Sequence, residues 1–162
     1  SSFDPQGYFN LEARTTFHFT ADGITPAMAM QMPEGKGSRY QTTYKDGDGN
    51  YLDGNKVYKL NMPPGVPVAL FWSVTLYDSW TRCELQSQPY PSISSQKKPA
   101  PRTNPDGSID IYFAAERPEG VAAENWIRTL PHQGFFAYIR YYGPLNAFND
   151  KSWVPNDVER VE

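Results

Sequence analysis

The chain has few residues of the kinds that hold a metal or start a nucleophilic reaction. Among 162 residues it has one cysteine, Cys83, and two histidines, His18 and His132. A single cysteine excludes an internal disulfide, and a tetrahedral zinc site would need carboxylates in addition to these residues. No Gly-x-Ser-x-Gly elbow is present. We therefore interpret Cys83 and both histidines as structural residues, and the sequence predicts no metal and no cofactor.

Clustered positive charge and long apolar runs are also missing. The chain has 15 Lys and Arg against 18 Asp and Glu, for a net charge of −3. Nucleic-acid binding needs a clustered Lys/Arg footprint, and Lys97, Lys98 and Arg102 lie among Pro and Ser as a solvated loop. No apolar run approaches the ~20 residues of a membrane helix. We expect no nucleic-acid partner and no membrane span.

The sequence has no signal peptide either. It begins at Ser1 rather than Met, which indicates a processed or trimmed form. The sequence alone therefore leaves the compartment open.

Turn residues and aromatic residues are abundant. The chain has 15 Pro and 12 Gly, and 15% of its residues are aromatic. This composition favours many short elements and an all-β sandwich or barrel over a helical bundle. The length fits a single domain that buries roughly 70% of its unfolded surface.

The segment VALFWSVTLYD, Val68–Asp78, is the clearest β-type run and lies within a long strand expected at Val66–Asp78. Side chains alternate between the two faces of a strand, so this one has two different faces. One face has Val68, Leu70, Trp72, Val74 and Leu76, and the other has Ala69, Phe71, Ser73, Thr75 and Tyr77. The first face predicts a core, and the second is the second core wall, a subunit contact or the floor of a ligand site.

Other segments complete a mainly β pattern. Further strands are expected at Arg39–Tyr44, Asn55–Met62, Ile109–Phe113 and Gly134–Tyr142, with Arg82–Gln86 continuing the long strand or returning beside it. Pro118–Leu130 predicts a helical turn or a connection, and Pro89–Pro105 predicts a long surface loop. Residues 1–38 form a helical or irregular lead-in, and residues 39–162 form one β-sandwich domain.

Within the lead-in, the pattern of Pro5–Phe19 favours a short N-terminal helix with Asp4 as its N-cap. Its later part, ARTTFHFT, also alternates as a strand would.

Acidic residues at 46–53 suggest calcium at first sight. An EF-hand loop starting at Asp46 needs Gly at its sixth position and an acidic ligand at its twelfth. These positions hold Tyr51 and Val57. The segment is better interpreted as a turn that uses Asp-Gly twice.

The strongest candidate for chemistry is Arg140 in the last strand. Tyr138 and Tyr142 share its face, and Asp110 of the preceding strand is a possible partner. An arginine framed by tyrosines can stack, bind a carboxylate in bidentate fashion or act as a structural hydrogen-bond hub. The candidate ligand-binding residues are Tyr77, Asp110, Tyr112, Asn125, Trp126, Tyr138, Arg140 and Tyr142. Asn125 and Trp126 are equally explained by satisfied backbone groups and packing.

Five motifs occur in an order that resembles a known family. They are YKLNMPPGVPVALFWSVTLYD, NPDGSIDIYF, ENWIRTLP, FFAYIRYYGPL and the closing Trp153-Val154-Pro155, with YKDGDGNYLDG upstream. The chain from Arg39 to Val158 resembles the bacterial family named domain of unknown function 1214. The resemblance implies a jelly-roll-like antiparallel β-sandwich that usually follows another domain in longer, often exported proteins. A periplasmic or secreted location is thus implied, and no catalytic residue carries over.

Three functions are compatible with these residues. The first is a binding module that uses an aromatic and Arg face for a small or saccharide ligand or for docking to a partner domain. The second is a structural domain that forms a homo-oligomer. The third is a hydrolase or lyase that uses Glu84 or Asp110 with Arg140 as anion stabiliser. The lack of a nucleophile–base motif favours the first.

Overall fold

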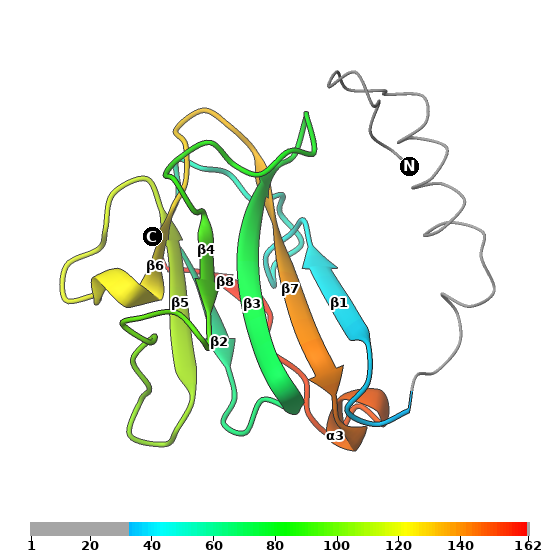
Figure 1. Ribbon diagram of the computed structural model, residues 1–162. Helices are drawn as coiled ribbons and strands as arrows, with labels where there is room; N and C mark the ends of the chain where they lie inside the picture. Colours follow the sequence, from blue (N-terminus) through cyan, green and yellow to red (C-terminus); the bar gives the residue numbers. More distant parts are fainter. Residues whose placement is uncertain (1–32, 162) are drawn as a thin grey trace, which may run out of the picture. The chain divides into compact units, whose positions relative to one another are not determined.

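Two β-sheets that share one core make up the part of the chain that the structure describes (Figure 1). The structure is a computed structural model that describes residues 33–161, so the expected helix Pro5–Phe19 lies outside the described residues. The first sheet has the order β1 (Ser38–Thr43), β7 (Phe135–Pro144), β3 (Val68–Asp78), β4 (Ser92–Ser94). The second has the order β6 (Trp126–Arg128), β5 (Ile109–Ala114), β2 (Tyr58–Met62), β8 (Val158–Arg160). The mainly β class is confirmed.

The described residues contain very little helix. The turn expected within Pro118–Leu130 is the 3₁₀ helix η2 (Ala123–Asn125), and a four-residue helix α3 (Asn146–Asn149) follows β7. Among these residues no helix is long and apolar enough to cross a membrane.

The first sheet is built around the long antiparallel pair β3 and β7. Trp72, Val74 and Leu76 of β3 face the core, as their alternation predicts. They lie opposite Tyr141, Ile139 and Ala137 of β7. The register shifts between Val68 and Phe71, which marks a bulge, and Leu70 is 67% exposed. The prediction that Leu70 joins the core face is therefore wrong, because a bulge breaks the alternation that the prediction assumes.

The second sheet supplies the opposite wall of the core. Its buried side chains are Tyr58, Leu60, Met62, Ile111, Phe113, Ile127 and Val158. The rings of Tyr58 and Phe113 meet the ring of Phe135 from the first sheet edge-on, at centroid distances of 5.9 and 6.0 Å. The two inner faces thus pack on each other, and each sheet keeps an outer face.

The pairing is not antiparallel throughout. Strand β6 runs parallel to β5, with Tyr112 opposite Trp126. A parallel partner needs a crossover of about a dozen residues, and the segment from 115 to 125, with η2 at its end, provides one. The prediction of an antiparallel sandwich is wrong for this pair.

The three-residue strands β4, β6 and β8 were not predicted, because three residues are too few to show a period. Arg82–Gln86 forms no strand of its own but returns beside β3, as one of the two predicted alternatives has it. Glu84 forms an antiparallel bridge with Tyr77, and Leu85 N donates to Leu76 O at 3.0 Å.

Candidate functional site

The outer face of the first sheet gathers aromatic rings from three segments. We call it the aromatic face. It consists of Tyr40 and Tyr44 from β1 and just beyond it, Phe71 and Tyr77 from β3, and Phe136, Tyr138, Arg140 and Tyr142 from β7. Tyr40 lies opposite Arg140 in the β1–β7 register, and Thr75 lies opposite Tyr138 in the β3–β7 register. Alternation on three neighbouring strands thus places these side chains on one surface.

Arg140 occupies the middle of the aromatic face and is half-buried. Its Nη1 donates to Thr75 Oγ1 at 3.0 Å, and its Nη2 donates to the Tyr77 hydroxyl. The guanidinium carbon lies 5.1 Å from the centroid of the Tyr138 ring and 5.5 Å from that of Tyr77, within cation–π range. Burial lowers the pKa of Arg140, but the hydrogen bond to Tyr77 and the nearby phenols outweigh it and raise the pKa above its usual value. The arginine therefore stays charged.

The rings of the aromatic face are packed mainly on one another. Phe136 stacks on Tyr44 with a centroid distance of 4.7 Å and on Tyr77 with one of 5.4 Å. Phe71 stacks on Tyr142 at 4.1 Å. Tyr40 is 50% exposed and meets Tyr138 edge-on. Because the stacked rings cover each other's faces, this surface offers edges, hydroxyls and a guanidinium more than open ring faces.

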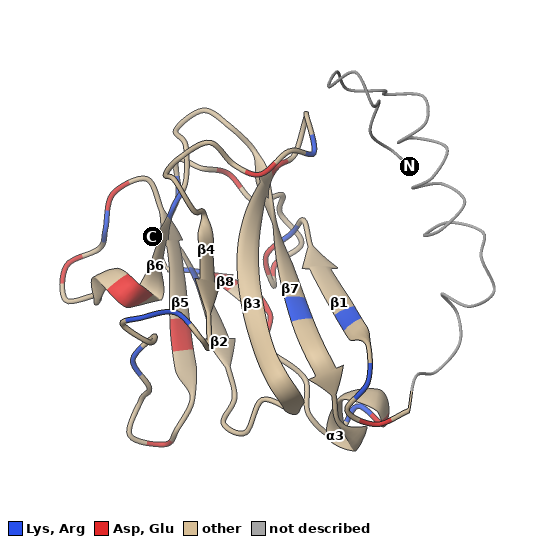
Figure 2. Cartoon of the chain, viewed as in Figure 1, with Lys and Arg blue, Asp and Glu red and all other residues tan. Residues whose placement is uncertain are grey.

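The strands of the first sheet carry two arginines and one acidic residue, although the whole chain carries −3. Figure 2 shows blue bands on β1 and β7, which correspond to Arg39 and Arg140. The acidic residue within the four strands is Asp78, at the end of β3. Glu84 bridges Tyr77 at the edge of the aromatic face, and no ion pair joins it to an arginine among the described residues.

Asp110 and Tyr112 lie on the other side of the molecule. They belong to β5, in the second sheet, and their neighbours Ile111 and Phe113 point into the core. Asp110 accepts hydrogen bonds from Asn61 Nδ2 at 2.7 Å and from Asn104 Nδ2 at 3.0 Å. The predicted pairing of Asp110 with Arg140 is wrong, because their strands belong to different sheets.

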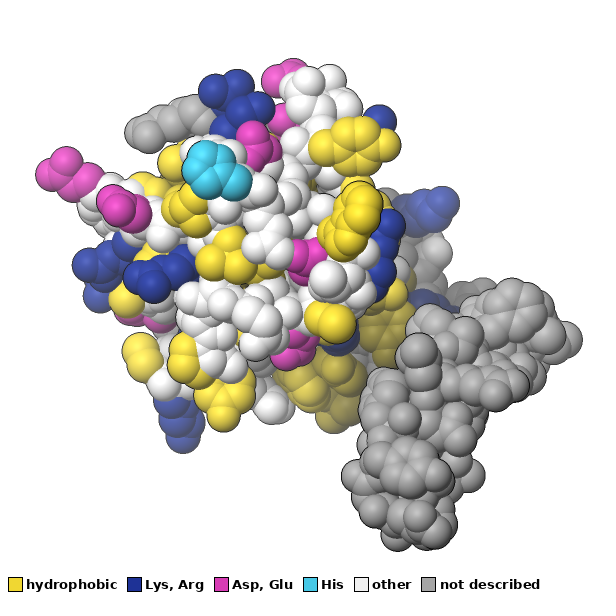
Figure 3. Space-filling view, turned by 90° about the horizontal axis from the view of Figure 1, so that it is seen from above, with side chains coloured by type: hydrophobic (Ala, Val, Ile, Leu, Met, Phe, Trp, Pro, Cys, Tyr) yellow, Lys and Arg dark blue, Asp and Glu magenta, His cyan; other side chains and the backbone are white. Residues whose placement is uncertain are grey.

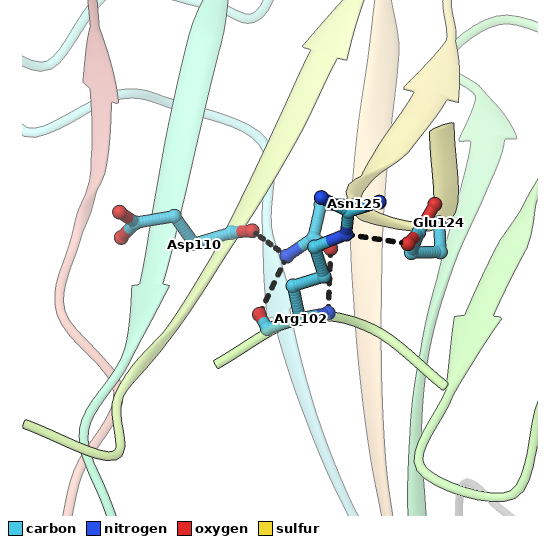
Figure 4. Close-up of polar contacts among 4 residues, drawn as sticks. All are labelled: Arg102, Asp110, Glu124 and Asn125. Carbon is cyan, nitrogen blue, oxygen red and sulfur yellow. Dashed lines mark hydrogen bonds and ion pairs between the residues drawn. The ribbon is translucent and has the colours of Figure 1, made fainter. Parts of the chain in front are cut away.

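Asn125 (Figure 4) and Trp126 both bind the chain's own backbone. The Asn125 side chain is buried, and its Oδ1 accepts from Arg102 N at 2.7 Å. Its Nδ2 donates to Arg102 O at 2.9 Å and to Asp110 O at 2.8 Å. Trp126 Nε1 donates to Ala114 O at 2.9 Å. Both residues thus fix a loop against β5, as the structural interpretation expected.

A known protein family matches more than half of this chain. A model of the family described as "Protein of unknown function (DUF1214)" matches residues 37–146. The chain belongs to the DUF1214 family. This membership confirms the resemblance that the sequence motifs indicated.

A solved structure from Vibrio parahaemolyticus resembles this DUF1214 chain in fold. The VPA0106 protein from Vibrio parahaemolyticus has a TM-score of 0.63 and 22% identity, over 93% of this chain and 35% of that one. An uncharacterised Burkholderia cenocepacia protein has a TM-score of 0.45 and 16% identity, over 99% of this chain and 44% of that one. The DUF1214 chain thus spans about a third of the Vibrio protein's length. No curated protein matches the sequence.

Two hollows in the described part of the DUF1214 chain lie away from the aromatic face. An open one of about 720 Å³ is lined by Gly49, Asn50, Tyr51, Leu52, Asp53, Asn55, Lys56, His132 and Gly134. A smaller one of about 240 Å³ lies between β1 and β8 and includes Gln41 and Val158. The sequence analysis did not predict the first hollow, because its lining residues at 49–56 and 132–134 are far apart in the sequence. Figure 3 views the loop end of the molecule, where apolar, basic and acidic side chains are interspersed.

Several carboxyl groups among residues 33–161 have lowered pKa values, which is the opposite of what a general acid needs. Hydrogen bonds from nearby turn, loop and side-chain groups hold several carboxyl pKa values below their usual range. These carboxyls are Asp53, Asp78, Asp106, Glu124 and Asp150. Asp46 accepts from the backbone N–H groups of Asp48 and Asn50, as a turn residue does. The described residues contain no group of three His, Cys, Asp or Glu side chains placed to hold a metal.

Proposed function

We propose that the aromatic face binds an anionic small or saccharide ligand, with Arg140 as its anchor, and that the domain is a binding module and not an enzyme. The observation that carries this proposal is the environment of Arg140. It is a half-buried cation with no carboxylate partner among the described residues. Removing a charge from water without a counter-ion costs free energy. An anionic ligand would recover part of that cost.

The hydrogen bonds of Arg140 leave capacity for such a ligand. A guanidinium has five N–H donors in a rigid fork, and those to Thr75 and Tyr77 use two of them. The same two bonds fix the plane of the fork. A carboxylate can then accept two parallel hydrogen bonds, the strongest geometry that arginine offers.

Ring stacking on a neutral sugar fits this surface less well. Phe136 already lies between Tyr44 and Tyr77, and Phe71 stacks on Tyr142. Hydroxyls lie beside Arg140, since Thr75 Oγ1 and Ser92 Oγ are 3.0 Å apart next to it. A ligand with both an anionic group and hydroxyl groups matches this combination.

Docking to a partner domain is a second candidate. Its support is the length of the Vibrio parahaemolyticus protein, of which this chain covers only 35%. A carboxylate side chain from another domain would satisfy Arg140 in the same way as a free ligand. Homo-oligomer formation remains an alternative for the same surface.

The strand order supports a jelly-roll arrangement as the finer description of the fold. The chain passes between the two sheets repeatedly, and β1 lies beside β7 while β3 lies beside β4. Jelly rolls contain Greek keys, in which a late strand returns to lie beside the first.

Calorimetry with a matched pair of sugars tests the proposal. We expect glucuronate to bind and glucose to bind far more weakly. Arg140→Gln should lower the glucuronate affinity at least tenfold, which is about 1.4 kcal/mol. Arg140→Lys should recover only part of the affinity, because it keeps the charge but loses the fork.

Arg128→Gln is the matched control, because Arg128 also lies over an aromatic ring, 5.3 Å from the Trp126 centroid, but belongs to β6 in the second sheet. Circular dichroism shows whether each variant folds. Equal binding of glucose and glucuronate, or full binding by a folded Arg140→Gln protein, would contradict the proposal.

A further inference from the structure

We propose that Arg82 forms a second anion subsite on the aromatic face, so that the ligand is an acidic oligosaccharide lying along β7 and not a single sugar. This inference rests on the proposed function and specifies its ligand class. It follows from the position of Arg82, from the row of rings between Arg82 and Arg140, and from the pairing of the strands beneath them.

Arg82 lies over the end of the aromatic face that contains Tyr44 and Phe136. Its guanidinium carbon lies 5.4 Å from the centroid of the Tyr44 ring and 5.6 Å from that of Phe136. The backbone there is left-handed, with φ of 64°, which is uncommon outside glycine. The turn is fixed by Arg82 N, which donates to Asp78 O at 3.0 Å. The chain therefore keeps this arginine over the rings in an otherwise unfavourable backbone conformation.

No acidic side chain forms an ion pair with Arg82 within residues 33–161. Asp78 is close in sequence, but its carboxylate accepts from Trp80 N, Thr81 N and Gln133. In Figure 2 the loop that follows β3 carries one blue segment above the blue band on β7. The charge of Arg82 contributes to the lowered pKa of Asp78, but neither Arg82 nor Arg140 forms an ion pair among the described residues. Two cations without an ion-pair partner thus lie on one aromatic surface.

The spacing along β7 between Phe136, which Arg82 overlies, and Arg140 sets the length of the ligand. Phe136, under Arg82, and Arg140 are four positions apart on β7, which is about 13 Å along a strand. A single small anion does not span this distance. Phe136 and Tyr77 lie between the two cations, and Tyr77 presents its hydroxyl to Arg140. A chain of hydroxyl-bearing units with an acidic group at each end of this span fits the surface.

An acidic peptide fits less well for a reason of backbone pairing. Strand β7 lies at the centre of this surface and pairs with β1 on one side and β3 on the other. Its backbone N–H and C=O groups are used in these ladders, so an added peptide strand has no ladder to join here. Side-chain hydroxyls and guanidinium groups are what remain, and they suit a saccharide.

The test compares galacturonate, tetragalacturonate, neutral maltotetraose and tetraglutamate by calorimetry on the full chain. We expect tetragalacturonate to bind at least about tenfold more tightly than galacturonate, because the second contact is then intramolecular. Arg82→Gln should remove that advantage, and Arg140→Gln should weaken tetragalacturonate more strongly still. Arg128→Gln should retain the wild-type preference, and high salt should reduce tetragalacturonate binding.

Each remaining outcome has a distinct meaning. If galacturonate binds through Arg140 but the tetramer binds no more tightly, or a folded Arg82→Gln protein keeps the advantage, the second subsite is refuted and the proposed function stands. If no acidic sugar binds, the proposed function itself fails. If tetraglutamate binds as tightly as tetragalacturonate and depends on both arginines, the ligand class is an acidic peptide and the saccharide inference is overturned.

Discussion

Asn125 shows how a polar residue can look functional in sequence and be fully used by the fold. Its amide makes three hydrogen bonds to the backbone of Arg102 and Asp110 (Figure 4). All of its ordinary donors and one acceptor are engaged, so little capacity is left for a ligand. Arg140 differs from Asn125, because its hydrogen bonds to Thr75 and Tyr77 leave other guanidinium N–H donors available for a ligand.

Asn125→Ala should therefore destabilise the domain without affecting ligand binding directly. It would leave one backbone N–H and two carbonyls without partners in a buried place, and we expect a loss of roughly 2–4 kcal/mol in the free energy of unfolding. Urea denaturation measures this loss. Glu124→Gln, which changes only the neighbouring ion pair to an exposed Arg102, should have a much smaller effect. Equal losses in both variants would contradict the assignment.

Asp78 makes stability depend on pH. The N–H group of Thr81 is the main cause that lowers the pKa of this buried carboxyl, and the N–H of Trp80 adds to it. A carboxyl with a lowered folded-state pKa stabilises the fold above its unfolded pKa, at about 4, and loses that contribution as the pH falls further. We expect Asp78→Ala to be clearly less stable than the wild type at pH 7. The difference should shrink near pH 3 in urea denaturation, and a constant difference would refute this account.

At the scale of elements, the alternation of apolar and polar side chains predicted the long strands but not the bulge in β3. The long strand, predicted at Val66–Asp78, begins two residues later at Val68, and Ile109–Phe113 and Gly134–Tyr142 also differ from β5 and β7 only at their ends. The bulge near Leu70 was invisible, because the sequence contains no glycine or polar residue there to mark it. A bulge depends on the partner strand, which a local pattern does not contain.

The backbone around Leu130 lies so close to Gly54 that there is no room for a side chain at position 54. A Cβ at this position would lie 1.9 Å from Leu130 O and 2.8 Å from Leu130 C, both of which are backbone atoms. Gly54→Ala should therefore separate the two segments and cost about 3 kcal/mol, measured as a fall in Tm. At Gly47 the nearest atom to a Cβ would be Asp157 Cβ at 3.5 Å, an ordinary contact. Gly47→Ala is thus the control, and a similar fall in both variants would show that the steric argument fails.

At the scale of the molecule, the sequence could not assign strands to sheets. Tyr77, Tyr138, Arg140 and Tyr142 were correctly grouped, because they come from neighbouring strands. Asp110 and Tyr112 were grouped with them because β5 has the same alternation, although it lies in the other sheet. The two-faced pattern of a strand shows that one side is buried, but not which neighbours it has. That information exists only in the tertiary fold.

The described core suggests that residues 34–162 can fold alone. They form a separate compact unit that contains both sheets. A chain that begins at Glu34 should show a β-type circular dichroism spectrum and one cooperative unfolding transition. The full chain, examined in parallel, is the reference. Absence of a cooperative transition in the shorter chain would show that residues before Glu34 complete the core.

The pairing of β3 with β7 also has a kinetic consequence. These strands are far apart in the chain, yet Val74 and Ile139 are direct partners. A loop that contains β4, β5 and β6 must close before this pair can form, and such non-local pairing slows folding to the millisecond-to-second range. Arg140 reaches Thr75 and Tyr77 only after that closure. The aromatic face is therefore a late product of folding, and partly folded chains will not present it to a ligand.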